Sequence, residues 1–214
     1  MTEHDTRTST LRGIDESTRS LVQIAAAIAG ADESTTRQVM ERAVSIADNS
    51  KVEEVILQSY LFAGFPRTLN AARIWRTASG TSAPPDDAEA RLSNASAWEE
   101  RGQDTCRTVY GESYEMLRQN IRALHPALDT WMIADGYGKV LSRPGLDLKT
   151  RELCIVAACA ASAQQRQLHS HLHGALNAGA TPAEVRGALA AVDDLAGPDD
   201  AQRYRQLLVR VLGK

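Results

Sequence analysis

Apolar residues recur at helical spacing through almost the whole of this chain of 214 residues, and this periodicity restricts the fold more than any other feature. The alternation of apolar and polar residues that is typical of strands is hard to find, and aromatic residues make up only 5% of the sequence. Helical segments are expected at 14–30, at 35–49, at 50–64 and from 148 onward. The sequence therefore predicts an all-α protein.

Glycine and proline mark the breaks between the expected helices. Residues 77–88, TASGTSAPPDDA, have the composition of a long loop or linker, and a helix is expected to restart at Pro66, shortly after Gly64. Residues 136–147, GYGKVLSRPGLD, are expected to form a loop that leads to Asp147, a candidate N-cap of the next helix.

A weak internal repeat runs through the sequence. The segment TRSLVQIAAAIAG at 18–30 is similar to TRELCIVAACAAS at 150–162, and EEVILQSYLFAG at 53–64 is similar to AEVRGALAAVDD at 183–194. The two pairs have nearly the same offset, as expected for two copies of one helical unit that cannot bury its apolar face alone. The alternative is that any two alanine-rich helices look alike.

The composition disfavours several classes of protein. The formal net charge is −3, with Lys and Arg scattered among Asp and Glu, so we expect no nucleic-acid partner. The longest apolar runs, such as IAAAIAG and LCIVAACAA, are too short to cross a bilayer, so we expect no membrane partner. An odd number of cysteines and a polar N-terminal stretch that does not resemble a signal peptide predict a cytoplasmic location.

Three histidines are clustered in QLHSHLHGALNAG, residues 167–179. In a strand, His169, His171 and His173 would share one face, and a metal site would be credible. No glycine or proline lies between residues 151 and 173, which predicts a helix and argues against a metal site. On a helix, His169 and His173 lie together on the polar side, whereas His171 flanks the apolar stripe.

His171 is open to two interpretations: a core histidine that binds a backbone carbonyl, or an acid–base group. Its candidate partner is Glu152, which would lie roughly 28 Å away on one straight helix. Ser162 with Gln165 three residues later resembles a capping box, which predicts a chain reversal near 162–163 and a helical hairpin. In that hairpin the carboxylate would orient the imidazole for proton transfer near neutral pH. The alternative for Glu152 is a solvated residue in the first turn of a helix.

Three segments carry motifs of one known family. Residues 141–189, with SRPGLD and H-x-x-GALN-x-G, resemble the carboxymuconolactone decarboxylase family, which has the all-helical alkyl hydroperoxidase D-like fold. Residues 98–114 resemble the start of a γ-carboxymuconolactone decarboxylase, and residues 53–75, with AGFP and a following Asn, resemble another segment of that family. The resemblance implies two related alkyl hydroperoxidase D-like helical units packed together, at 1–80 and 81–214.

The resemblance also separates two branches of the family. The peroxidase branch carries Glu, then C-x-x-C, then His four residues beyond the second cysteine. Counted from Glu152, the cysteine positions fall on Gln164 and Gln167, and the histidine position falls on His171. Glutamine forms no thiolate, so a cysteine-based peroxidase is disfavoured. The decarboxylase branch lacks the cysteine pair and keeps the histidine, and is therefore the nearer relative.

The resemblance implies a cofactor-free, decarboxylase-like lyase that acts on a small cyclic carboxylate or lactone and forms a homo-oligomer. His171, oriented by Glu152, would donate a proton to the carbanion or enolate that remains after carbon dioxide leaves. The other expected substrate-binding groups come from the same unit, and they are Gln164, Gln167, Arg151 and Arg143. The alternative for both arginines is a surface position.

The first unit has lost the pair that the second unit keeps. Ser20 falls at the position of Glu152, and Val39 falls at the position of His171, so the site of unit 1–80 is degenerate. That unit keeps YLFAGFP, and its residues Tyr60, Phe65 and Pro66 are expected to wall the pocket of the second unit.

A non-catalytic small-molecule-binding or accessory protein of the same fold is the alternative to an enzyme. A buried His171 without a partner, or without a cavity beside it, would favour that alternative.

Overall fold

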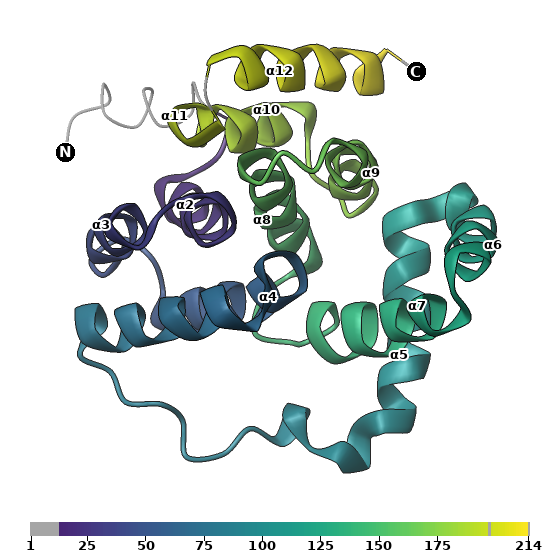
Figure 1. The fold of residues 1–214 in the computed structure, drawn as a ribbon, viewed down its shortest axis with the longest axis horizontal. Coiled ribbons are helices and arrows are strands. Elements are labelled where there is room, and N and C mark those ends of the chain that lie inside the picture. Colours follow the sequence, from purple (N-terminus) through teal and green to yellow (C-terminus); the bar gives the residue numbers. More distant parts are fainter. Residues whose placement is uncertain (1–12, 197, 214) are drawn as a thin grey trace.

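The computed structural model describes residues 13–196 and 198–213, and these residues form helices and connecting loops without a β-strand (Figure 1). The prediction of an all-α protein is confirmed. The helices in chain order are α2 (Glu16–Gly30), α3 (Glu33–Ala43), α4 (Asn49–Ser79), η1 (Ala88–Ala90), η2 (Leu92–Asn94), α5 (Ala95–Tyr110), η3 (Gly111–Ser113), α6 (Tyr114–Leu124), α7 (Pro126–Trp131), η4 (Met132–Leu141), α8 (Leu148–Ala161), α9 (Gln165–Asn177), α10 (Pro182–Ala190), α11 (Asp193–Ala196) and α12 (Pro198–Leu212).

Side-chain caps fix where several of these helices begin. Asp15, Asp32 and Asp147 each accept a hydrogen bond from the backbone N–H three residues later, which satisfies one of the free donors of the first turn. Thr181 and Glu184 form a reciprocal capping box at the start of α10. The predicted role of Asp147 as an N-cap is confirmed.

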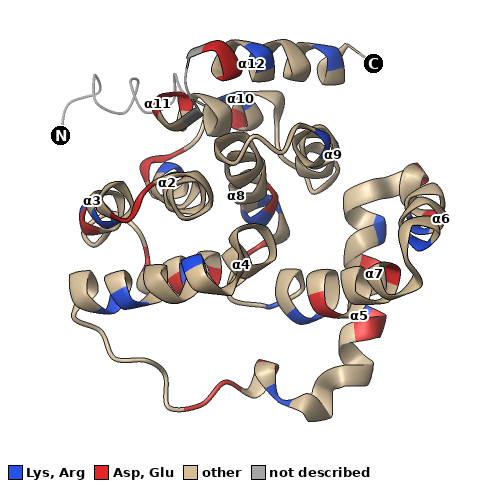
Figure 2. Ribbon diagram, in the orientation of Figure 1, with Lys and Arg blue, Asp and Glu red and all other residues tan. Residues whose placement is uncertain are grey.

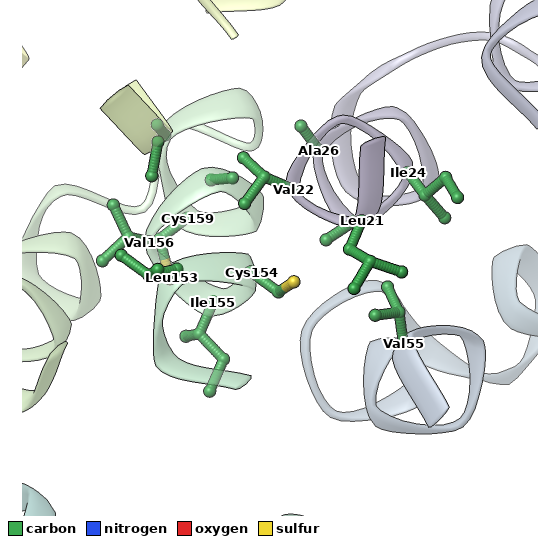
Figure 3. Close-up of a cluster of buried hydrophobic side chains, with 14 of the residues drawn as sticks. Leu21, Val22, Ile24, Ala26, Val55, Leu153, Cys154, Ile155, Val156 and Cys159 are labelled. Carbon is green, nitrogen blue, oxygen red and sulfur yellow. The ribbon is translucent and has the colours of Figure 1, made fainter. Parts of the chain in front are cut away.

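The centre of the core lies where α2 and α8 pack side by side with α4 across them (Figure 1). In Figure 3, Val22 of α2 points toward α8, Cys154 of α8 points toward α2, and Leu21 points toward Val55 of α4. The helices approach closely, because a Cβ on Gly30 would lie 2.3 Å from the carbonyl oxygen of Ala161.

The first pair of segments of the sequence repeat lies on neighbouring helices. The segment 18–30 belongs to α2, and its counterpart at 150–162 covers all but the first two residues of α8 and one residue beyond it. These two helices pack against each other. Gly80 ends α4 in a left-handed conformation, at the expected boundary between units 1–80 and 81–214, and the division into two related units stays a prediction. Residues 1–12, 197 and 214 of these units lie outside the described residues.

Helix α4 bends where glycine and proline were expected to separate two helices. Gly64 has φ 77° and ψ 164°, which no helical residue adopts, and Pro66 lies in the first turn of the part that follows. The first straight part of α4 ends at this bend. Its last residues include Tyr60, Leu61 and Phe62, which line the cavity described below.

The expected loop at 136–147 is wrong for its first half. Residues 136–141 belong to η4, a π-helix whose residues pack along α5. A Cβ on Gly138 would lie 1.8 Å from the carbonyl oxygen of Trp98, and one on Gly102 would lie 2.1 Å from that of Ile133. Gly138 therefore allows two helix backbones to meet, and does not mark a turn.

Candidate active site

Helices α8 and α9 form the predicted helical hairpin. The chain reverses at residues 162–164, where Ala163 has a left-handed φ of 57°. The predicted capping box at Ser162 and Gln165 is wrong. Ser162 ends α8 and donates its hydroxyl hydrogen bond back to the carbonyl oxygen of Ala158, while Gln164 precedes α9 without a side-chain cap.

The hairpin brings Glu152 and His171 into contact, as expected. The Nδ1 atom of His171 lies 2.8 Å from Oε2 of Glu152. Glu152 is 0% exposed and His171 is 6% exposed, so the contact is almost dry. The Oε1 atom of Glu152 has no hydrogen-bond partner among residues 13–196 and 198–213. A buried carboxylate oxygen without a partner is unfavourable for folding alone, and is more typical of a functional site.

Gly174 and Phe62 surround this pair. A Cβ on Gly174 would lie 2.6 Å from Oε2 of Glu152 and 2.7 Å from a methyl carbon of Val109, so only glycine leaves room for the carboxylate beside α9. The ring of Phe62, from α4, meets the His171 ring edge-on at a centroid distance of 5.9 Å. The imidazole is therefore held by a hydrogen bond on one side and by an aromatic ring on another.

His171 lies in the wall of a cavity of about 590 Å³, within the usual range for small-molecule sites. The wall is mostly apolar and aromatic, and comes from α4, α5, α6, α7, η4 and α9. Its residues are Tyr60, Leu61, Phe62, Tyr110, Leu117, Ile121, Leu128, Trp131, Met132, Asp135, Gly136, Tyr137, Leu141, Arg166, Gln167, Ser170 and His171.

Three phenols in this wall stay protonated at neutral pH. Burial raises the pKa of Tyr110 to about 12 and raises that of Tyr137 well above its usual range. Burial, with a smaller effect from the charge of Asp135, also raises the pKa of Tyr60. The hydroxyl groups of Tyr60 and Tyr110 are therefore available as hydrogen-bond donors to a bound molecule, whereas the hydroxyl group of Tyr137 is engaged by a hydrogen bond with Tyr110.

Two of the expected substrate-binding residues, Gln167 and Tyr60, line the cavity together with His171. Gln164 does not: it is exposed and its amide donates to the carbonyl oxygen of Ser162. Phe65 packs on Tyr60 with ring centroids 5.1 Å apart, but it is 64% exposed and lies outside the lining. Pro66, beside it, is exposed and also lies outside the lining.

The structure places the two expected carboxylate-binding arginines elsewhere. Arg151 is 0% exposed, and its Nη2 atom lies 2.7 Å from Oε2 of Glu54. Arg143 lies 2.9 Å from Oε1 of the same Glu54 and 2.8 Å from Oδ2 of Asp87. Neither arginine lines the His171 cavity, because both guanidinium groups are engaged by these carboxylates.

Sequence reasoning missed the charged residues that do line the cavity. The lining contains one basic side chain, that of Arg166, and one acidic side chain, that of Asp135. Arg166 lies between Gln164 and Gln167 in sequence, and this position could have identified it as a candidate for the site. Asp135 directly precedes the segment 136–147, which was expected to be a loop, so no feature of the sequence placed it at a site.

The other candidate chemistries find less support. Within the described residues, no group of three or more His, Cys, Asp or Glu side chains is arranged to hold a metal, and the rings of His169 and His173 form a pair 5.0 Å apart. Cys106, Cys154 and Cys159 are buried and unpaired. Burial raises the pKa of each thiol to about 12, which disfavours the thiolate that a peroxidase needs.

The fold and the site define an all-helical protein whose helical hairpin holds a buried carboxylate–imidazole pair at a small-molecule cavity. The model of the carboxymuconolactone decarboxylase family matches residues 127–208, and this segment includes both members of the pair. The match confirms the family expected from the sequence.

A search among curated proteins finds a relative named Peroxisomal protein 2, from Schizosaccharomyces pombe. It is 33% identical over 141 residues, which are 64% of this chain, and the chain spans 65% of the length of that relative. In the part of the chain that the structure describes, no helix is both long enough and apolar enough to span a membrane.

Proposed function

We propose that this protein is a cofactor-free, decarboxylase-like lyase that acts on a small cyclic carboxylate or lactone. The observation that carries the proposal is the hydrogen-bonded Glu152–His171 pair in the wall of a mostly apolar cavity of about 590 Å³. The family description names a reaction class that needs such a proton-transfer group.

His171 is the proposed catalytic residue and Glu152 its positioning residue. Glu152 binds Nδ1, which leaves Nε2 to exchange a proton with a bound substrate. The bond between the ring carbon and the carboxylate carbon breaks, the electron pair stays on the ring as a carbanion or enolate, and carbon dioxide leaves. Nε2 of the protonated imidazole then gives its proton to the ring carbon, and the imidazole regains a proton from water.

Polar groups of the cavity wall are proposed to hold the substrate. Arg166 takes the role that the sequence assigned to Arg143 or Arg151, because it is the arginine that lines the cavity. Gln167 and the Tyr60 hydroxyl group are proposed to donate hydrogen bonds to a lactone oxygen. The apolar remainder of the wall suits the hydrocarbon part of a cyclic substrate.

The test compares wild type with His171→Ala on carboxymuconolactone and a panel of small cyclic carboxylates and lactones, with carbon dioxide release as the readout. We expect kcat of the variant to fall by about 10²- to 10⁴-fold, the usual contribution of a positioned acid–base group. His173→Ala, on the same helix but outside the cavity lining, is the control and should keep the wild-type rate. Equal rates for wild type and His171→Ala would refute the role of His171.

The alternative is a non-catalytic small-molecule-binding or accessory protein. A partner for His171 and a cavity beside it both support the enzyme over this alternative. Saturable binding of panel compounds to wild type without turnover of any of them would instead favour the binding protein.

We further propose a cytoplasmic homo-oligomer. Large apolar residues are exposed on α6 and α7, as expected for a surface that another copy covers, and they are Met116, Leu124, Leu128 and Trp131. Sedimentation that gives a monomer at micromolar concentration would contradict the oligomer. The relative's name describes that yeast protein as peroxisomal, so imaging of the tagged protein in its own cells is the test of location.

A further inference from the structure

A second cavity, of about 410 Å³, lies between α9 and α12. It borders a different face of α9 from the His171 cavity, since its lining includes His169, two residues away and about 200° around the helix. The lining residues are Gln165, Arg166, His169, Arg203, Tyr204, Leu207 and Arg210.

Positive charge is concentrated in this cavity. Its lining holds three arginines and a histidine, and no aspartate or glutamate. Figure 2 shows Lys and Arg positions on both α9 and α12. The chain as a whole is slightly acidic, with a net charge of −3, so the sign of the charge in this cavity is opposite to that of the whole chain.

The arginines of this cavity are largely free of internal partners. Arg203 lies 3.0 Å from Asp200 on the same helix, and both side chains are substantially exposed to solvent. Within the described residues, neither Arg166 nor Arg210 has a carboxylate within 4.0 Å. Such cations differ from Arg143 and Arg151, whose guanidinium groups are engaged by Glu54.

Other groups of the lining also suit an anion. Gln165 and Arg166 belong to the first turn of α9, a helix of 13 residues, where free backbone N–H groups and the helix dipole favour negative charge. The buried Tyr204 belongs to the same wall, and its hydroxyl has no hydrogen-bond partner within residues 13–196 and 198–213. Leu207 adds an apolar surface for the organic part of a ligand.

We infer that this cavity binds a small molecule that carries a phosphate or pyrophosphate group. Three guanidinium groups from two helices can bind several oxygens of one such group, and guanidinium geometry matches phosphate oxygens. A ligand with a single negative charge would leave most of the positive charge unbalanced. This cavity shares Arg166 with the His171 cavity and is otherwise lined by different residues, and the inference does not depend on the proposed function.

The experiment is isothermal titration calorimetry of the full chain with pyrophosphate, inorganic phosphate, phenyl phosphate and, for comparison, succinate. We expect saturable binding in which pyrophosphate binds more tightly than succinate. Tighter binding of phenyl phosphate than of inorganic phosphate identifies a phosphorylated organic ligand, and the reverse order identifies the free ion. Absence of saturable binding up to millimolar pyrophosphate, or succinate binding as tightly as pyrophosphate, would overturn the inference.

The matched variants are Arg203→Gln with Arg210→Gln, and Arg205→Gln as the control. Arg166 is left intact because it also lines the His171 cavity. Arg205 lies on the same helix, pairs with Asp193 and lies outside the cavity lining. The double variant should weaken pyrophosphate binding at least tenfold while the control stays within about twofold. An equal loss in both, with unchanged helical circular dichroism, would show non-specific attraction to α12 and overturn the site.

Discussion

Two neighbouring residues of α8, Arg151 and Glu152, belong to two very different charged clusters. Arg151 joins Arg143 around Glu54, where both carboxylate oxygens of Glu54 are bound by guanidinium groups. Glu152 is the next residue on the helix, and it hydrogen-bonds to His171 through one of its two oxygens while the other has no partner within residues 13–196 and 198–213. Both carboxylates are buried, yet only one of them is fully paired.

The number of engaged carboxylate oxygens distinguishes a structural cluster from a candidate site. The Glu54 cluster satisfies its charges internally, joins α4 to α8 and lines no part of the His171 cavity. The Glu152–His171 pair leaves hydrogen-bonding capacity unused and borders the cavity. A fully satisfied network stabilises the fold, whereas an incompletely satisfied pair at a cavity is available for chemistry.

The largest effect on stability is expected from Glu54→Gln. The variant leaves Arg151 buried without its carboxylate, which costs about 3–5 kcal/mol in similar buried pairs. The measurement is urea unfolding at pH 7. The control is Glu53→Gln, whose partly exposed pair with Arg76 should be worth about 1 kcal/mol or less. If Glu54→Gln lowers the free energy of unfolding no more than the control does, the Glu54 cluster does not stabilise the fold as proposed.

Gly174→Ala should have the next largest effect. Its Cβ collides with both Glu152 and Val109, and overpacking of this kind typically costs about 1–3 kcal/mol. Displacement of Glu152 should also lower any turnover that depends on His171. Gly136→Ala is the control, because its Cβ meets no atom closer than 3.9 Å, and thermal unfolding should leave it near wild type. Wild-type stability and activity for Gly174→Ala would mean that the pair tolerates rearrangement.

Acid should weaken the Glu54 cluster selectively. Burial raises the pKa of the Glu54 carboxyl, but the hydrogen bonds and charges of Arg143 and Arg151 outweigh it and hold the pKa below the ordinary value of 4.5. The cluster therefore contributes its stability above pH 4.5 and loses it as pH falls through the lower folded pKa.

Urea titrations of wild type and Glu54→Gln from pH 7 to pH 3 test this dependence. The difference between their free energies of unfolding should be constant at neutral pH and shrink below 4.5, by at most about 1.4 kcal/mol per pH unit. A difference that grows on acidification would reverse the assigned sign.

The smallest stability effect is expected from Glu152→Gln. The substitution removes a buried charge that has a single partner, and the amide keeps a hydrogen bond to Nδ1 of His171, so the change should stay below about 1 kcal/mol. Turnover should fall, because the imidazole loses the carboxylate that orients it. If Glu152→Gln destabilises the protein as much as Glu54→Gln, the two clusters serve the same structural purpose.

Much of the site was predictable because it depends on local sequence. Helical periodicity and a break near residue 162 predicted the hairpin, and the hairpin alone brings Glu152 to His171. The reversal occurs although the expected cap is wrong, since the left-handed Ala163 makes the turn. Residue roles in catalysis and substrate binding stay proposals.

The remaining errors come from contacts distant in sequence. Arg151 meets Glu54 across 97 positions, and no local pattern reveals that α4 supplies a carboxylate to both arginines. Gly138 looks like a turn residue in sequence, but it belongs to η4, where the backbone of α5 leaves no room for a Cβ. Tertiary contacts here override local preference, as they commonly do for glycine and for long charged side chains.

The π-helical winding of η4 makes the length of this segment a determinant of the pocket. Each turn of a π-helix holds more residues than an α-helical turn, and Tyr137 and Leu141 reach the cavity from this wide helix. Deletion of one residue between 132 and 141 would let the segment rewind as an α-helix and rotate the following side chains by about 100°. A substitution in η4 changes one side chain of the cavity wall, whereas a single deletion would turn several η4 side chains away from the cavity at once.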